Sequence, residues 1–566
     1  MPKSKILLSA FLISILGAWP LAHATKITPI HAIQGSDSQS RLTGQECTIE
    51  GVVVGDFQKK DQLRGFFVQE KDADADERTS EGIFVYDSHV RVRMGDWVRV
   101  TGKIAEYHGL TEIKSVRNVK VIKKGVPLPP PVTVRLPFQN ANYPERFEGM
   151  RVVLAQTLTV SDTFGLGRYG HVTLSEGRLM APTQVALPGK DASAVSAANA
   201  LNQIILDDGS EAQNPDLKSS PLLRFSKKKT LRSGYTVTGL TGVLTYAFGK
   251  YRIHPTEPPQ FDAKANPRGN SPDVKGRLRV ASFNVLRYFN GPDFLIPGGA
   301  KNPKAFRRQR AKIINAITAM NADIIGLMEL ENDGYGPDSA IHDLVKGLNQ
   351  AAPSGASYAF VKPNLRQAQV PNTRRLGDQD ITLGLLYNKK AVALVGNPAT
   401  KRDGAFAGKN RQPLAGTFRE TRTGEQVTVV VCHFKSKTSR SPCPNDPDQG
   451  DGQGTCNKTR TKASADLMKW LVSDPTGVRD PDILIIGDLN AYLMEDPVVA
   501  FEKKGYANLI RAKAKPGAYS YVHGGEAGCL DHALASPSLA KQVTGIAYWH
   551  INADEPYICN RDTKSG

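Results

Sequence analysis

The sequence predicts a multidomain protein in which two β-rich regions precede a layered α/β sandwich. The chain has 566 residues, which is too long for one ordinary hydrophobic core. Up to about residue 262, short apolar runs alternate with Gly, Asp and charged turns, a pattern typical of β-strands. From residue 277 onward, buried apolar runs alternate with amphipathic helices, as in layered α/β domains. Helices are predicted over residues 303–320 and 459–473.

Residues 1–24 are typical of a secretory signal peptide. Lys3 and Lys5 precede an apolar run over residues 6–16, and residues 22–24 form an Ala-His-Ala cleavage site. The apolar run is too short to span a bilayer, and no later stretch is long and apolar enough for a membrane helix. We therefore expect a secreted or periplasmic protein without stable membrane insertion.

Basic residues outnumber acidic ones, with 73 Lys and Arg against 55 Asp and Glu and a net charge of +18. This excess favours a polyanionic partner, and nucleic acid is the commonest one. Solubility alone would explain the same excess, so charge does not decide between the two. No protein partner is predicted.

Six Cys residues follow the signal peptide, and disulfides are permitted in an exported protein. Cys443 and Cys456 flank a loop rich in Pro, Gly and Asp, and we predict a bridge between them. A bridge that closes a loop of this size contributes about 3 kcal/mol. The other four have several possible pairings: Cys47, Cys432, Cys529 and Cys559.

Residues 25–126 are predicted to form a small five-stranded barrel of the oligonucleotide/oligosaccharide-binding (OB-like) class. Tyr107 and Phe67 are candidates for stacking on bases. The acidic loop over residues 72–76 suggests calcium, but it lacks the ligands of an EF-hand, and a solvated turn is the stronger interpretation.

Residues 127–262 are predicted to form a second β-rich region, and residues 263–276 a linker. A polar stretch over residues 191–233 separates the strands of this second region. Within it, three Lys residues at 227–229 are a candidate phosphate contact, although a solvated face explains such a run better.

Polar side chains follow the buried strands of the α/β region. In residues 481–492 (PDILIIGDLNAY), an apolar run ends in Asp488 and Asn490, which point to the same side of an extended segment. Asp488 can deprotonate water, and Asn490 can donate hydrogen bonds to phosphate oxygens. An Asp-x-Asn turn after a strand is the structural alternative. The other candidates lie at or near further predicted strand ends: Asn284, Glu329, His433 and Asp531.

This ordered set resembles the endonuclease/exonuclease/phosphatase superfamily, which has a deoxyribonuclease I-like fold. More closely, the mature chain resembles secreted bacterial nucleases of the ExeM/NucH type, in which an OB-like domain precedes the nuclease domain. The resemblance is carried by VTGLTGVLTYAFGKYR, GLMELENDGYGPDSAIHDLV, HFKSK before a paired-Cys loop, IIGDLNAY and LDHALASPSLAKQVTG. It implies that residues 277–566 form a four-layered α/β sandwich.

The resemblance also implies roles for the candidate residues. Glu329, with Asn284 beside it, is the expected ligand of Mg²⁺ or Mn²⁺, with Ca²⁺ as a further candidate. Asp488 would activate water, His433 would hydrogen-bond or protonate a phosphate oxygen, and Asn490 would hold the phosphate. Asp531 completes the catalytic set, and the predicted substrate-binding residues are Lys435, Arg411 and Tyr521.

Two of these assignments have structural alternatives. Glu329 could be an exposed strand-end carboxylate, and Glu331 lies close enough to be confused with it. A lone His such as His433 is more often a satisfied core residue. The surrounding motifs favour the functional interpretation for both Glu329 and His433.

The chain departs from the superfamily pattern near its C-terminus. The superfamily usually finishes with Ser-Asp-His-x-Pro on a final strand, whereas Asp531-His532 aligns with an earlier strand. The sequence therefore predicts a truncated or frame-shifted domain that lacks its last strand. Loss of a principal acid/base group costs several orders of magnitude in rate, so we expect impaired activity.

We expect a secreted, divalent-metal-dependent endonuclease that hydrolyses phosphodiester bonds of extracellular nucleic acid, with DNA favoured over RNA. Two alternatives stay open. One is a phosphoesterase of the same fold acting on lipid headgroups or nucleotides, which predicts an exposed apolar docking hairpin that the sequence does not show. The other is a truncated, non-catalytic protein that binds nucleic acid, marked by salt-sensitive binding without hydrolysis.

Overall fold

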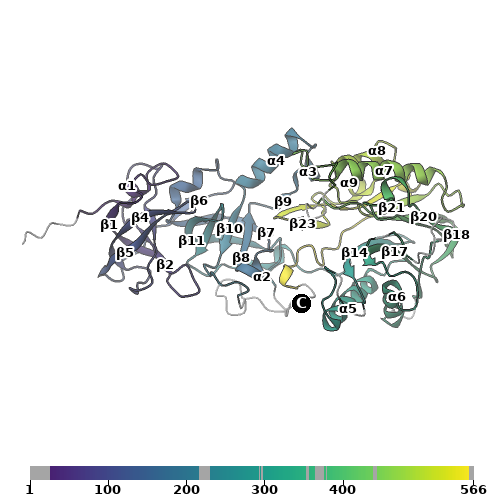
Figure 1. Ribbon diagram of the computed structural model, residues 1–566, viewed down its shortest axis with the longest axis horizontal. Helices are drawn as coiled ribbons and strands as arrows, with labels where there is room; N and C mark the ends of the chain where they lie inside the picture. Colours follow the sequence, from purple (N-terminus) through teal and green to yellow (C-terminus); the bar gives the residue numbers. More distant parts are fainter. Residues whose placement is uncertain are drawn as a thin grey trace, which may run out of the picture.

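The computed structural model describes residues 26–215, 230–291, 294, 297–351, 356–363, 375–377, 379–437 and 443–559. The predicted signal peptide and the Lys run at 227–229 lie outside these residues. The described chain is elongated, with a β-barrel at one end, a β-rich middle unit and an α/β sandwich at the other end (Figure 1). Within the described ranges, no helix is both long and apolar enough to span a membrane.

The N-terminal strands close into a five-stranded barrel in the order β1-β2-β3-β5-β4, and β4 pairs back onto β1. Apolar side chains of these strands fill its interior, and Ile30 and Ile33 of the short helix α1 (Ile30–Gln34) join them. The predicted five-stranded barrel is therefore confirmed. Phe67 is fully buried, so its predicted role in base stacking is wrong, whereas Tyr107 is exposed. The strands are β1 (Glu46–Phe57), β2 (Gly65–Gln69), β3 (Gly82–Val85), β4 (Trp97–Tyr107) and β5 (Leu110–Lys123).

The middle unit is built on a seven-stranded sheet in the order β13-β11-β12-β10-β8-β7-β6, with β11 also paired to β7. The pairing of β11 with β7 curls the sheet, and the apolar side chains on its inner face form the core of the unit. The strands are β6 (Val132–Val134), β7 (Arg151–Asp162), β8 (His171–Ser175), β10 (Ile204–Asp207), β11 (Thr236–Ala247), β12 (Lys250–Pro255) and β13 (Phe261–Asp262).

The polar stretch after residue 190 holds structure that its composition did not reveal. It contains helix α4 (Lys190–Leu201) and strand β10. The helix sequence KDASAVSAANAL is rich in Ala and Ser and buries only Ala192 and Asn199, so it has no apolar face to detect.

The α/β sandwich has four layers. Two sheets pack face to face through apolar side chains such as Met328, Leu385, Val431 and Ile486. Helices α5 and α6 cover the outer face of one sheet, and α7, α8 and α9 cover the other (Figure 1). This arrangement agrees with the predicted sandwich. The helices are α5 (Pro303–Met320), α6 (Ala340–Ala351), α7 (Asn457–Val472), α8 (Asp496–Glu502) and α9 (Leu509–Lys513).

The first sheet has the strand order β14-β15-β17-β16, and the second has the order β18-β19-β20-β21-β25-β22. The first contains β14 (Val280–Tyr288), β15 (Ile324–Glu331), β16 (Tyr358–Phe360) and β17 (Ile381–Asn388). The second contains β18 (Val392–Thr400), β19 (Leu414–Glu420), β20 (Gln426–His433), β21 (Ile483–Asp488), β22 (Ala507–Asn508) and β25 (Asp531–Ala535). The predicted disulfide between Cys443 and Cys456 is present, and the other four Cys residues are free.

A small sheet ties the middle unit to the sandwich. Strand β9 (Leu179–Met180) of the middle unit pairs with β24 (Glu526–Gly528), which forms a hairpin with β23 (Tyr521–His523). Next to it, Thr183 donates a hydrogen bond of 2.6 Å to Glu495. Because backbone pairing between β9 and β24 joins the two units, the middle unit is held against the sandwich.

Candidate active site

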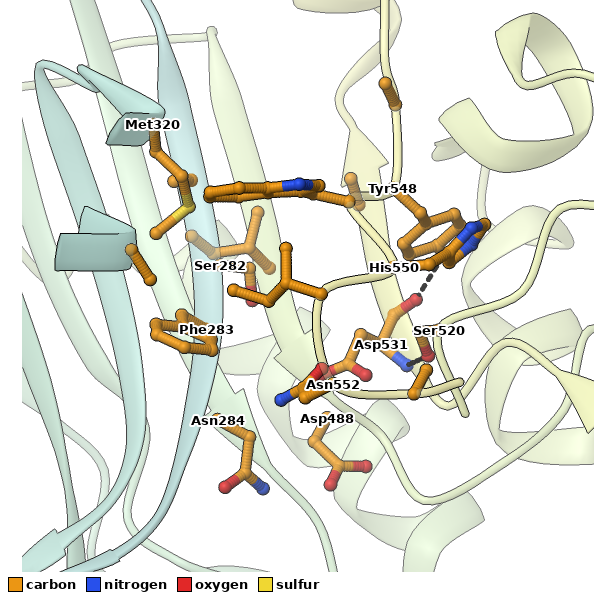
Figure 2. A pocket seen from close by; sticks show the side chains of 18 of the residues that line it. Ser282, Phe283, Asn284, Met320, Asp488, Ser520, Asp531, Tyr548, His550 and Asn552 are labelled. Carbon is orange, nitrogen blue, oxygen red and sulfur yellow. Dashed lines mark hydrogen bonds between the residues drawn. The ribbon is translucent and has the colours of Figure 1, made fainter. Parts of the chain in front are cut away.

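The polar strand ends of both sheets line one cavity of about 2600 Å³ at the edge of the sandwich. Asn284 projects into it from β14, and Asp488 and Asp531 project from the opposite sheet (Figure 2). The structure therefore brings together residues that lie far apart in the sequence. The predicted residues along the lining are Asn284, Glu329, Arg411, His433, Asp488, Asn490, Tyr521 and Asp531.

Asn284 and Glu329 lie where their strands leave regular pairing. The β14–β15 register shifts after Asn284, and the β15–β17 register shifts on either side of Glu329. Glu329 has a φ of +65°, a strained value for a residue with a side chain. Such bulges re-aim side chains, and here Asn284 Nδ2 donates a hydrogen bond of 3.1 Å to Glu329 Oε1.

The end of β21 needs Gly487 for a steric reason. Gly487 has a φ of +131°, and a Cβ there would clash with the carbonyl oxygen of Cys432 on β20. The next residues form a tight turn in which the Asn490 N–H donates to Asp488 Oδ1 at 2.8 Å. The Asn490 side chain donates to the carbonyl oxygen of Phe434 at 3.0 Å, so part of its amide is used to position the loop.

Three carboxyl groups interact in the cavity. Asp488 and Asp531 are register partners across β21 and β25. Burial raises the pKa of Asp488 well above its usual range, and the charges of Asp531 and Glu329 raise it further. Burial, with a smaller contribution from Glu329, also raises the pKa of Asp531, against a hydrogen bond from Ser520. The cavity therefore concentrates negative charge with little solvent to screen it.

His433 and Arg411 face these carboxyl groups. The buried His433 places Nε2 3.6 Å from Asp488 Oδ2. Its pKa lies well below the usual value because of burial and the neighbouring charges of Arg411, Arg287 and Lys435, so the imidazole is neutral at neutral pH. The guanidinium of Arg411 donates from Nη1 to the carbonyl oxygen of Phe434 at 2.9 Å. Among the described residues, His433 Nδ1 and Arg411 Nε are buried without a hydrogen-bond partner.

The remaining predicted residues differ in position. Tyr521, on β23, is 44% exposed and lines the cavity. Lys435 is buried outside the lining, and its backbone N–H donates to Asn410 Oδ1 at 2.9 Å. His532, next to Asp531, turns into the protein, where its Nε2 lies 2.7 Å from the carbonyl oxygen of Ala491. Burial lowers the pKa of His532 to about 4.

Several residues of the cavity were not predicted. Ser520 accepts the backbone N–H of Asp531 at 3.1 Å and so orients the end of β25. His550 and Asn552 of the C-terminal segment also line the cavity, and Figure 2 shows Asn552 beside Asp531 and Asp488. From the middle unit come Asp162 and Phe164. No motif marks the middle-unit residues, because only the docking of that unit brings them here.

The carboxyl and amide oxygens of Glu329 and Asn284 suit a hard divalent cation. Within the described residues, no three His, Cys, Asp or Glu side chains converge as a ready-made metal site. Mg²⁺ is commonly held by one or two carboxylates, with waters and substrate phosphates completing the shell. The carboxyl groups of Asp488 and Asp531, whose pKa values are raised first by burial and then by neighbouring carboxyl charges, fit such a cation.

Two family comparisons cover much of the described chain. Residues 281–550 match the Endonuclease/Exonuclease/phosphatase family. Residues 139–263, most of the middle unit, match a domain of unknown function, DUF8508. No curated protein matches the chain.

Solved structures share low identity with this chain. The human Nocturnin catalytic domain with bound sulfate is 18% identical, covering 47% of this chain and 85% of that one, with a TM-score of 0.31. A mannosyl-6-phosphatase from Bacteroides thetaiotaomicron is 16% identical over 46% and 86% of the chains, with a TM-score of 0.31. D. rerio TDP2 with a single strand DNA product is 15% identical over 46% and 83%, with a TM-score of 0.29. By its sequence match, the region 281–550 is a domain of the endonuclease/exonuclease/phosphatase family.

Proposed function

We propose that this protein hydrolyses phosphodiester bonds of nucleic acid, DNA in preference to RNA, as a divalent-metal-dependent endonuclease. The observation that carries the proposal is the single cavity that holds Glu329, Asn284, Asp488, His433 and Arg411. These groups offer oxygen ligands, a proton acceptor, a neutral imidazole and a phosphate-binding cation. The family match of residues 281–550 and the net charge of +18 support it.

Each residue has a defined task in this proposal. Asp488, with its raised pKa, accepts a proton from the attacking water more readily than an ordinary carboxylate. His433, 3.6 Å from Asp488, orients that water or hydrogen-bonds a phosphate oxygen. The unpartnered Nε of Arg411 donates to the phosphate, whose charge the guanidinium offsets. A divalent cation held by Glu329 and Asn284 would offset charge on the phosphate and stabilise the departing oxygen.

The N-terminal part of the chain supports hydrolysis of nucleic acid outside the cell. We propose that residues 1–24 direct export and that the five-stranded barrel is an OB-like module that captures polynucleotide. Among the described residues, β14 is the edge strand of its sheet, and its half-buried residues Ala281 and Phe283 line the cavity.

The direct test is plasmid nicking by the purified chain with Mg²⁺ or Mn²⁺, and with EDTA as the control. A small phosphodiester, bis(p-nitrophenyl) phosphate, tests the same chemistry without a polynucleotide. Slow, EDTA-sensitive cleavage of both substrates would support the proposal. Salt-sensitive DNA binding without any hydrolysis would instead identify a non-catalytic binding protein.

Metal binding should change how stability depends on pH. Because Asp488 and Asp531 have raised pKa values in the fold, the stability that their protonation contributes is fully present below the unfolded value, 3.8. That stability is lost as pH rises through the folded pKa values. We expect Mg²⁺ to raise the thermal unfolding midpoint more at about pH 8 than at about pH 5, because it binds the ionised cluster. If scanning calorimetry found that Mg²⁺ leaves the unfolding midpoint unchanged at both pH values, that result would contradict the predicted site.

Arg411 should matter through its guanidinium. We expect Arg411→Ala to lower kcat/KM for DNA by roughly 100- to 1000-fold, as for loss of one preorganised donor to a transition state. Arg411→Lys should recover little, since an ammonium cannot reproduce the planar fork. Lys409→Ala removes an equal charge from an exposed side chain nearby and serves as the control. Equal effects of Arg411→Ala and Lys409→Ala would show that only net charge counts.

A further inference from the structure

We propose that the middle unit, with the C-terminal segment and the hairpin that pack on it, forms a base-stacking wall of the active-site cavity and thereby selects single-stranded nucleic acid. This inference rests on the proposed function, because it assumes that the cavity receives a polynucleotide. It assigns a role to a unit whose family is described only as a domain of unknown function. The wall consists of Phe164 and Tyr557, with Tyr521 on the hairpin beside them.

Phe164 is presented to solvent by a turn that follows the end of β7. It is 70% exposed, although its neighbours Thr163 and Leu166 are buried and anchor the turn in the core of the middle unit. Its backbone N–H donates to Asp162 Oδ1 at 2.8 Å, and helix α2 (Leu166–Tyr169) follows directly. The exposed ring is therefore not required for packing of the core, and the backbone that carries it is held by the hydrogen bond to Asp162.

A second exposed ring lies against Phe164. Tyr557 opens the short helix η4 (Tyr557–Cys559), is 60% exposed, and has its ring centroid 6.0 Å from that of Phe164. This helix packs on α2 so closely that a Cβ on Gly167 would lie 3.0 Å from Ile558. Both rings line the cavity that contains Asp488 and Asp531. Single exposed aromatic residues are ordinary, but a pair at the rim of a catalytic cavity indicates a binding surface.

The wall continues toward the carboxyl groups. Gly525 lies in the turn of the β23–β24 hairpin. A Cβ atom on Gly525 would lie 3.6 Å from the Cβ atoms of Ser161 and Asp162, so the hairpin rests on the end of β7. This contact places Tyr521, which stacks on His523 at 6.1 Å, between the middle unit and the strand ends. Exposed rings thus extend from the reacting groups outward along one side of the cavity.

The charge of this rim matches a polynucleotide backbone. Lys312 and Arg287 line the same cavity, as does Arg268, which pairs with Glu555 at 2.6 Å. Arg168 lies 5.4 Å over the ring of Tyr169 on α2. Cationic side chains interleaved with exposed aromatic rings are the combination that binds single strands, because every unpaired base has a face for stacking. In a duplex those faces are covered by neighbouring bases, so this wall favours single-stranded or locally unpaired substrate.

The test measures binding by the full chain without added divalent cation, so that no turnover occurs. A labelled oligothymidylate is compared with an abasic backbone of equal length by fluorescence anisotropy. We expect the wild-type chain to bind the base-bearing strand more tightly. We expect Phe164→Ala to weaken its binding by roughly 5- to 150-fold, the stacking contribution of one base, and Phe164→Trp to restore it. The slope of affinity against salt should stay constant, since no phosphate contact is removed.

Phe248→Ala is the matched control, because Phe248 is 91% exposed on the middle unit but does not line the cavity. It should leave oligonucleotide binding unchanged. Equal affinity of the wild-type chain for abasic and base-bearing strands, or equal losses in the two Phe variants, would overturn the inference. Hydrolysis of bis(p-nitrophenyl) phosphate is scored separately. Base-dependent binding without any hydrolysis would refute the proposed function and leave the stacking wall standing.

Discussion

Replacing Glu329 by Gln should abolish metal-dependent phosphodiester hydrolysis, with kcat falling at least about a thousand-fold. The substitution preserves size and hydrogen bonding but removes the charge that would hold a cation between β14 and the opposite sheet. The Asn284 amide already donates to Glu329 at 3.1 Å, and an amide at position 329 keeps an oxygen to accept that bond. The loss should therefore be catalytic, with the fold retained by circular dichroism.

Glu331→Gln is the stringent control for this experiment. Glu331 lies two residues further along β15, and its Oε2 accepts the backbone N–H of Asn290 at 2.9 Å. It has the same chemistry on the same strand and serves a structural contact. We expect it to keep the turnover of the wild-type chain. If Glu331→Gln were inactive and Glu329→Gln active in plasmid nicking with Mg²⁺, the assignment of the metal ligand would be wrong.

Replacing Asp554 by Ala should cause the largest loss of stability, about 3–5 kcal/mol, because it breaks a buried ionic network. Asp554 is fully buried and accepts hydrogen bonds from Tyr519 Oη and Asn266 Nδ2, each at 2.8 Å. It also pairs with Arg178 at 3.3 Å and with the buried Arg232 at 3.8 Å. Without the carboxylate, Arg178 loses its ion pair, and the buried Arg232 keeps only its pair with Glu555 at 2.7 Å.

The same substitution should loosen the C-terminal segment from the middle unit, since Asp554 joins the two. Urea unfolding would measure the loss, and hydrogen exchange would show reduced protection near residues 549–559. Asp273→Ala breaks an exposed pair with Lys275 and should leave the free energy of unfolding nearly unchanged. Similar losses in the two variants would show that the network around Asp554 contributes no more than a surface ion pair.

Local patterns in the sequence predicted the elements of the sandwich well. The helix predicted over residues 303–320 is α5, because Pro303 and the Asn302 cap define its start and its apolar residues recur on one face. The disulfide between Cys443 and Cys456 was also predictable from a local feature, because its two Cys residues flank one loop and lie 13 residues apart. Phe67 shows the limit of such patterns: an aromatic residue on a strand looks the same in sequence whether its face lies inside the barrel or outside.

The sequence by itself determined which chemical groups this protein can use, since Asn284, Glu329, His433 and Asp488 each follow an apolar run and Asp531 precedes one. It also predicted that these groups lie at or near strand ends and so collect at one edge of a sandwich. Only the tertiary structure decided that the buried imidazole of His532 contacts the carbonyl oxygen of Ala491, and that Lys435 is buried outside the lining of the cavity that holds Asp531. It alone placed Phe164 at the rim. The physical reason is that strand periodicity assigns alternating faces but not which face meets a cavity, and contacts between units depend on surfaces that no local pattern encodes.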